Sequence, residues 1–308
     1  MSFEYAIIVK SKTRLETLIE RFNTKAQAKF YIERLGGSFE EYEIEDEIFK
    51  NALNALQTQL SKVIKNKTID RHYVSSYIFS KKNIIVVIGQ DGLVANTAKY
   101  SDNLPIIAVN PDTERYDGIL LPFNITNFIQ GVENVLTNNY NSKIMSFAEA
   151  TLNDGQRLLA FNDLFIGAST HVSARYKITF KDKIEQQSSS GIIVSTSAGS
   201  TGWLSSIFNM ANGVTSMFEK NSTLKQPKLK ENDLFFAVRE PFKSLKTQTE
   251  MTAGIIRNNT LTIESFMPNN GIIFSDGIEK DFLNFNSGAI ATIGIAKETA
   301  NIVEKSWL

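Results

Sequence analysis

The sequence predicts an α/β amino-terminal domain with a mainly parallel sheet, followed by a carboxyl-terminal domain of antiparallel, all-β structure. Up to about residue 147, short apolar runs alternate with helical patterns, which is typical of a parallel sheet covered by helices. After that point, short alternating runs are separated by turn residues, which indicates antiparallel strands. We therefore expect two domains, 1–146 and 147–308, and the last residues of the second could pack back on the first.

In the first half, apolar runs predict buried strands and capping signals predict helix starts. The predicted strands are residues 5–9, 84–88, 106–109 and 119–121. Thr13 and Glu16 have the spacing of a capping box, and Thr24 repeats the start signal. Amphipathic or apolar patterns predict further helices over residues 46–64, from about residue 94, and near 125–136.

The second half has the spacing of short strands in an antiparallel domain. The predicted strands are residues 158–166, 174–180, 192–195, 233–238, 254–257, 260–264 and 271–274. One helical insert is expected after Ser200, and the lysine-rich stretch 220–230 is expected to form a loop.

Composition excludes several classes of function. The 33 basic and 33 acidic residues cancel, which gives no electrostatic reason to expect nucleic acid or an anionic membrane as the main partner. Without cysteine, the chain has no disulfide, zinc–thiolate site or cysteine nucleophile. No run approaches the roughly 20 apolar residues that span a bilayer. We expect a soluble, cytoplasmic protein with small-molecule partners, in which any metal is a hard ion bound through oxygen.

The stretch 84–100 is the most informative segment of the chain. A buried strand runs into a turn in which Gly89 and Gly92 surround Asp91, and helix-compatible residues follow. Open α/β sheets bind ligands at the carboxyl ends of their strands, where glycines and a helix start favour phosphate. Asp91 would there accept a proton from a hydroxyl or hold a metal. The same turn also suits an ordinary β–α connection, so alone it leaves both interpretations open.

A second unusual segment covers residues 193–203. An apolar strand ends in hydroxyl residues and glycines and then enters a helix that contains Trp203. Hydroxyls and free backbone N–H groups form a natural cradle for phosphate or ribose oxygens. A serine-rich helix cap is common, and taken by itself this segment slightly favours the cap.

Together, the two segments resemble the NAD kinase family, which belongs to a superfamily with the diacylglycerol and sphingosine kinases. Residues 89–92 (Gly-Gln-Asp-Gly) resemble the Gly-Gly-Asp-Gly turn of that family, and Asn162-Asp163 resembles its Asn-Glu or Asn-Asp motif. Residues 196–203 resemble its Thr-x-x-Gly-Ser-Thr-Ala-Tyr segment, and residues 275–277 resemble its late Asp-Gly pair. Asn110 matches the asparagine of its Gly-rich segment. The resemblance extends from about residue 84 to 280.

The resemblance implies an ATP-dependent kinase that phosphorylates the adenosine ribose 2′-hydroxyl of NAD, with Mg²⁺ as the expected metal and NAD bound between the domains. Asp91 would be the general base, and Asn162 and Asp163 would hydrogen-bond the adenosine. The other expected nucleotide-binding residues are Gly89, Gln90, Gly92, Asn110, Thr196, Gly199, Ser200, Thr201 and Trp203. No residue is assigned as a resident metal ligand. The resemblance also implies a homo-oligomer built through the β domain.

The chain departs from the family pattern at several positions. Gln90 replaces a glycine, which would narrow the approach of a phosphate or demand another backbone angle. The segment after Asn110 is longer and lacks the usual aromatic, and Trp203 replaces a tyrosine. Two alternatives therefore stay open: a superfamily kinase for a lipid or another alcohol, and a non-catalytic dinucleotide-binding module. We interpret Asp276 as a residue of a hairpin turn.

Overall fold

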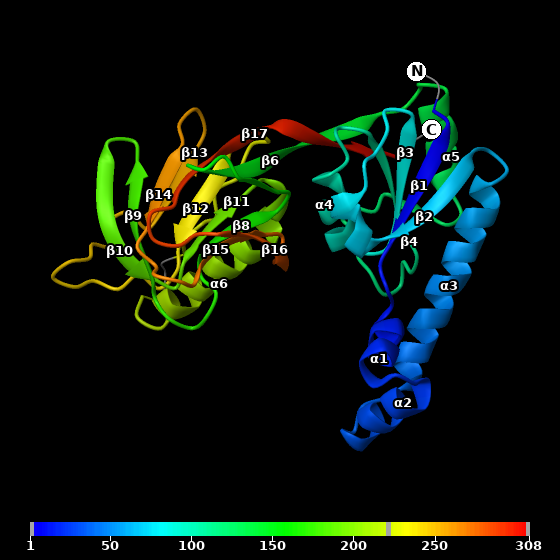
Figure 1. Ribbon diagram of the computed structural model, residues 1–308, viewed down its shortest axis with the longest axis horizontal. Helices are drawn as coiled ribbons and strands as arrows, with labels where there is room; N and C mark the ends of the chain where they lie inside the picture. The colour runs from blue at the N-terminus through cyan, green and yellow to red at the C-terminus, as the bar shows by residue number, and fades with distance from the viewer. Residues whose placement is uncertain (1–2, 220–222, 306–308) are drawn as a thin grey trace. The chain divides into compact units, whose positions relative to one another are not determined.

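The computed structural model describes residues 3–219 and 223–305, and the chain divides into two compact units. The amino-terminal unit comprises the chain up to Ile144 together with the stretch from Ala300. The β unit comprises Met145–Thr299. The break thus lies two residues before the one drawn from the sequence (Figure 1).

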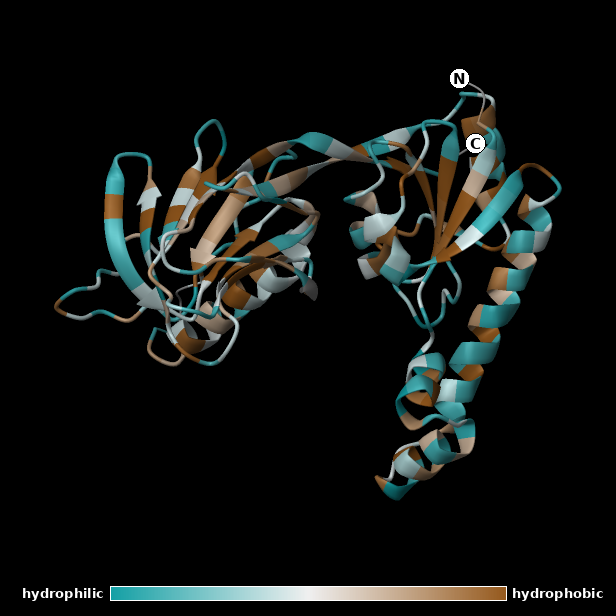
Figure 2. Ribbon diagram, viewed as in Figure 1, coloured by the Kyte–Doolittle hydropathy of each residue, from teal (hydrophilic) through white to brown (hydrophobic). Residues whose placement is uncertain are grey.

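A parallel sheet forms the centre of the amino-terminal unit. Its strands are β1 (Tyr5–Lys10), β2 (Lys65–Asp70), β3 (Asn83–Ile88), β4 (Pro105–Asn110), the short β5 (Phe123–Asn124) and the end of β17 (Ile290–Val303). The order is β17-β4-β3-β1-β2, β5 pairs with β4, and all these pairs are parallel. Every residue of β3 and β4 is buried, which explains their continuous apolar runs. The polar β2 at the sheet edge contrasts with these strands (Figure 2).

Helices connect and cover these strands. They are α1 (Arg14–Phe22), α2 (Lys25–Arg34), α3 (Glu40–Leu60), the 3₁₀ turn η1 (Arg71–Ser76), α4 (Asp91–Ala98) and α5 (Phe128–Leu136). The predicted capping box is present in both directions, because Thr13 Oγ1 accepts from the Glu16 N–H and Glu16 accepts from the Thr13 N–H. Thr24 caps α2 in the predicted way. Helices α1 and α2 lie beyond the end of the sheet at which β1 ends (Figure 1).

Two local predictions for this unit need correction, and one strand was missed. Helix α3 begins at Glu40 rather than residue 46, because its first turn is acidic, which suits a helix amino terminus but carries no apolar periodicity. Residues 119–121 form a turn rather than a strand: the Leu121 N–H donates to the Gly118 carbonyl, and Gly118 has a φ of 64°. Strand β2 was not predicted, because an edge strand with one buried residue shows no apolar run.

The β unit contains two antiparallel layers. One is a six-stranded sheet in the order β13-β12-β11-β8-β15-β16, and the other has the path β10-β9-β14-β17, with β6 pairing β17 and β7. The strands of the first layer are β8 (Asp163–Ala168), β11 (Ile192–Ser195), β12 (Leu234–Val238), β13 (Ala253–Ile256), β15 (Gly271–Ser275) and β16 (Ile278–Asn284). Those of the second are β6 (Ser142–Leu152), β7 (Arg157–Ala160), β9 (Ala174–Phe180), β10 (Lys183–Ser189), β14 (Leu261–Ser265) and part of β17.

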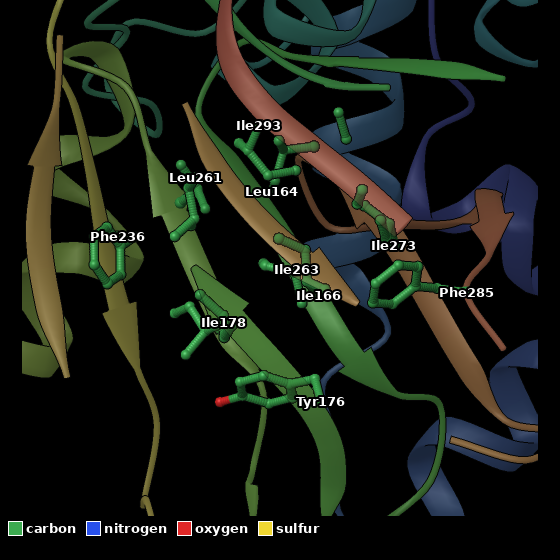
Figure 3. Packing of buried hydrophobic residues seen from close by; sticks show 14 of the residues in the cluster. Leu164, Ile166, Tyr176, Ile178, Phe236, Leu261, Ile263, Ile273, Phe285 and Ile293 are labelled. Carbon is green, nitrogen blue, oxygen red and sulfur yellow. The ribbon is translucent and has the colours of Figure 1, made fainter. Parts of the chain in front are cut away.

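The core of the β unit lies between these two layers (Figure 3). Leu164 and Ile166 of β8 and Ile273 of β15 pack in one cluster with Ile178 of β9 and Ile263 of β14. Alternate residues of each strand thus point inward, as in other packed sheets. The 3₁₀ turn η2 (Ala198–Thr201) and the predicted helical insert, α6 (Trp203–Ser216), follow β11.

Two further predictions for the second half concern the run 158–166 and the loop 220–230. The run 158–166 forms two strands, β7 and β8, rather than one. The predicted loop 220–230 has no helix or strand over residues 223–230, and its residues 220–222 lie outside the described residues. Among the described residues, none of the helices has the length and apolarity that crossing a membrane requires.

Candidate functional site

Asp91 lies at the carboxyl end of the central strand β3 and is the first residue of α4. Its Oδ1 accepts the backbone N–H of Leu120 at 2.8 Å. The positive end of the α4 dipole favours a carboxylate at this position. The Gly89 N–H donates to the Val109 carbonyl, which ties the turn to β4. The structure therefore presents Asp91 at the strand end, as predicted, and holds one of its carboxylate oxygens in place.

Gln90 occupies the altered position of this turn without strain. Its φ of −104° and ψ of 164° are ordinary extended values, and its side chain is exposed. Gln90 thus takes ordinary backbone angles, and the narrower approach for a phosphate stays a prediction. Gly89, by contrast, has a φ of 156°, and a Cβ there would lie 3.0 Å from Leu93 Cδ2. Gly89 is thus the glycine that the turn requires, whereas Gly92 has open space around it.

Asn110 ends β4 and organises the loop that follows. Its Nδ2 donates to the Tyr116 carbonyl and its Oδ1 accepts the Asp112 N–H, both at 2.9 Å. Asn110 is buried, and a Cβ at Gly118 would lie 2.8 Å from its Nδ2. Both ends of the Asn110 amide are therefore used inside the loop of residues 111–121. Its predicted contact with nucleotide stays a prediction, and its visible role is to shape the loop that delivers Leu120 to Asp91.

The β unit brings a second set of predicted residues together. Thr196 Oγ1 donates to the Phe161 carbonyl at 2.6 Å, and the Thr196 N–H donates to the Asn162 carbonyl at 2.9 Å. The Gly199 N–H in turn donates to Thr196 Oγ1 at 3.2 Å. A Cβ at Gly199 would lie 2.3 Å from the Asn162 carbonyl oxygen. Two motifs that are separated by more than thirty residues thus form one cluster, which only glycine at position 199 permits.

Asp276 fastens this cluster, a role that the sequence analysis missed. As predicted, Asp276 and Gly277 form the turn between β15 and β16, with φ values of 54° and 70°. The Asp276 carboxylate also accepts the backbone N–H groups of Phe161, Asn162 and Asp163, at 3.1, 2.6 and 3.3 Å. These three N–H groups point to a carboxylate, which explains why the predicted single strand is interrupted here. The Asp-Gly pair was visible in the sequence, but its partners were not.

Ser200, Thr201 and Trp203 follow the cluster at the start of α6. Ser200 Oγ donates to the Ser197 carbonyl, and Thr201 is exposed. Trp203 stacks on Phe165 at 5.8 Å between ring centroids, and the Arg239 guanidinium lies 5.5 Å from the Trp203 ring centroid. Trp203, Phe165 and Arg239 border a cavity of about 870 Å³ in the β unit. Trp203 therefore lies on the outer face of the six-stranded sheet, beside a cavity large enough for a small molecule.

Comparisons with known proteins agree on one family. No family model matches the chain. The NAD kinase of Chlorobium phaeobacteroides is 33% identical over 126 residues, which are 38% of this chain and 42% of that protein. The NAD kinase of Chlorobaculum tepidum is 27% identical over 121 residues, with the same shares covered. The match therefore spans less than half of the length of these curated relatives.

The fold comparison covers nearly the whole chain. A crystal structure of yeast NADH kinase complexed with NADH superposes with a TM-score of 0.60 over 99% of this chain and 84% of that chain, at 15% identity. These sequence and fold comparisons support a divergent member of the NAD kinase family. The two-unit architecture of the chain, a parallel α/β unit and an antiparallel β unit, is the fold that the resemblance implied. Gln90 and the long loop after Asn110 are the positions at which the chain departs most from the pattern of that family.

Asp163 carries the strongest electrostatic perturbation among the expected NAD kinase residues. The pKa of the Asp163 carboxyl is raised from 3.8 to about 7: burial is the main cause, a hydrogen bond from Ser195 opposes it, and the neighbouring Asp276 charge adds to the rise. Asp163 Oδ1 is buried and has no hydrogen-bond partner. A buried acceptor without a donor costs about 1–3 kcal/mol. A donor hydroxyl or N–H group placed on Asp163 Oδ1 would remove this cost.

We expect Asp163 to make the fold less stable as pH rises. Its folded pKa lies above its unfolded pKa, so the folded state retains a proton that the unfolded chain loses between about pH 4 and 7. The contribution of Asp163 to the free energy of unfolding is fully present below about pH 4. It falls between about pH 4 and 7, by at most about 4 kcal/mol. Asp163→Asn should abolish the fall. Thermal melts from about pH 3 to 8 cover this window, and parallel curves for both proteins would contradict the prediction.

No resident metal cluster accompanies these residues. Among the side chains that the structure describes, no group of three or more His, Asp or Glu residues is placed to hold a metal ion. Mg²⁺ usually takes only one or two carboxylates from a protein and completes its shell with substrate phosphates and water.

Proposed function

We propose that this chain is an NAD kinase that transfers the terminal phosphate of ATP to the adenosine ribose 2′-hydroxyl of NAD. The observation that carries the proposal is Asp91, a carboxylate fixed at the end of a buried strand by the Leu120 N–H, in a chain of the NAD kinase family. NAD kinase is the printed name of both curated relatives, and the solved structure is of an NADH kinase with NADH.

In the proposed step, Asp91 is the general base. Oδ1 is engaged by Leu120, so Oδ2 takes the proton of the 2′-hydroxyl as that oxygen bonds to the γ-phosphorus. The bond from the γ-phosphorus to the bridging oxygen breaks, and ADP leaves with its electron pair. A positioned base contributes about 10²–10⁴-fold, and positioning and charge neutralisation supply most of the rest. Mg²⁺ bound by the ATP phosphates would neutralise negative charge on the transferred group.

The cluster of the β unit is the proposed binding site for the adenosine of NAD. Asp163 Oδ1 is a buried acceptor that lacks a donor, and a ribose hydroxyl would supply one. Asn162 lies beside it, and its backbone is fixed by Asp276 and Thr196. We propose that Gly199, Ser200, Thr201 and Trp203 line the same dinucleotide groove. We also propose that the β unit forms the contact between subunits of a homo-oligomer.

The test is direct. Purified protein is incubated with ATP, Mg²⁺ and either NAD or NADH, and NADP or NADPH is measured with a dehydrogenase that accepts only the phosphorylated form. We expect product that depends on ATP. If ADP were released with a lipid or another alcohol but not with NAD, the phosphate acceptor would be that alcohol and not NAD. Tight calorimetric binding of NAD without any phosphate transfer would instead establish a non-catalytic binding module.

A further inference from the structure

The loop of residues 111–121 lacks a hydrophobic anchor over most of its length, although it delivers the N–H that holds Asp91. Ile119, next to Leu120, is 76% exposed, and Leu121 is the apolar residue of the loop that is buried. The loop is held mainly by polar contacts: Asp112 Oδ1 accepts the N–H groups of Glu114 and Arg115, both at 3.2 Å. Segments with few buried apolar contacts open locally at low cost, so a further restraint is needed to fix Leu120.

Arg115 supplies such a restraint from within the loop. Its Nη1 lies 3.1 Å from Glu45 Oε2 on helix α3, and its Nε lies 3.6 Å from Asp112 Oδ2. The planar guanidinium thus bridges a carboxylate of the loop and a carboxylate of a helix seventy residues away. Glu45 is only 8% exposed and also pairs with Arg14. A buried carboxylate needs such partners, and Arg14 remains as one when Arg115 is removed.

We propose that Arg115 is a positioning residue for Asp91: the Arg115–Glu45 bridge clamps the loop of residues 111–121 so that the Leu120 N–H holds Asp91 Oδ1. The kinetic part of this proposal rests on the proposed kinase function. An error of about 1 Å in the position of a catalytic group can cost about 10²-fold in rate. The segment of residues 111–121 also differs from the Gly-rich segment of the NAD kinase family. The Arg115–Glu45 bridge is therefore not a feature that the resemblance to that family predicts.

The kinetic test compares the Arg115→Met variant with a control variant, Arg157→Met, in which another arginine is replaced in the same way. We expect Arg115→Met to lower kcat by about 10- to 100-fold, with the KM for NAD changed less than about 3-fold. The Arg115→Lys variant keeps the positive charge but loses the planar set of guanidinium N–H donors, so it should retain more kcat than Arg115→Met. Guanidinium ion added to Arg115→Met should also recover part of kcat. The control is Arg157→Met, because Arg157 also bridges two carboxylates, Glu149 and Glu298, but in the β unit. Its kcat should equal that of the wild type.

A second measurement does not depend on activity. Amide hydrogen exchange reports whether the N–H of Leu120 is protected, and we expect exchange over residues 118–121 to rise at least about 10-fold in Arg115→Met but not in Arg157→Met. Unchanged exchange, or an unchanged kcat in an active enzyme, would overturn the proposal. If the wild type makes no NADP, the proposed function fails, while the exchange experiment still decides whether the bridge holds the loop.

Discussion

Asp91→Asn should lower kcat for NADP formation by about 10²–10⁴-fold while the protein stays folded. The asparagine has the shape of the aspartate, and its amide oxygen can still accept the Leu120 N–H that Asp91 Oδ1 accepts at 2.8 Å. It cannot take a proton from a hydroxyl. The loss of charge at the start of α4 should reduce stability by no more than about 1 kcal/mol. Steady-state kinetics measures the loss of kcat, and thermal melting measures the loss of stability.

The control for this variant is Asp117→Asn. Asp117 is an exposed aspartate in the loop after β4, so its replacement removes the same charge from the same unit. We expect its kcat to stay within about 2-fold of the wild type, as for most surface substitutions. If Asp91→Asn also kept wild-type kcat, Asp91 would not be the base. If it melted far below Asp117→Asn, its loss of activity would reflect misfolding.

Gly199→Ala should weaken NAD binding by at least about 10-fold and destabilise the β unit by about 1–3 kcal/mol. The added Cβ would lie 2.3 Å from the Asn162 carbonyl oxygen and 2.8 Å from Asp163 Oδ1. The contact with a carbonyl oxygen cannot be relieved by a rotamer change, so the backbone at Asn162 has to move. That movement breaks the hydrogen bond from the Thr196 N–H to the same carbonyl. Calorimetric titration with NAD measures the binding.

Gly213→Ala is the matched control for Gly199→Ala. Gly213 lies in α6 of the same unit, and a Cβ there meets no atom within 4 Å. Alanine is the better helix former, so this variant should gain up to about 1 kcal/mol of stability and bind NAD as the wild type does. Equal NAD affinity in both glycine variants would show that the Asn162–Thr196–Gly199 cluster is not a binding site.

The fold was predictable where the sequence carries local signals. The apolar runs of β3 and β4 identify buried parallel strands, and Thr13 identifies the start of α1, because burial and capping depend on neighbouring residues in the chain. Strand β2 escaped prediction because it lies at a polar sheet edge. The break between β7 and β8 also escaped, because the three N–H groups there bind Asp276, more than a hundred residues later.

For the candidate site, the sequence located individual residues but not the contacts that hold them. Motif order located Asp91 at a strand end and brought Asn162, Thr196 and Gly199 into consideration together, and the hydrogen bonds of the β unit join these last three. Sequence could not show that Leu120 holds Asp91, nor that Arg115 reaches Glu45. Both contacts depend on how a loop without apolar periodicity folds back, and such a loop carries no pattern that predicts its partners.

The proposed chemistry depends most on Asp91 acting as the general base for the adenosine ribose 2′-hydroxyl of NAD. A crystal structure of the Asp91→Asn variant with NAD, Mg²⁺ and a non-hydrolysable ATP analogue tests this most directly. We expect the 2′-hydroxyl within hydrogen-bond distance of residue 91 and in line with the γ-phosphorus. A ribose held far from residue 91 would contradict this role of Asp91.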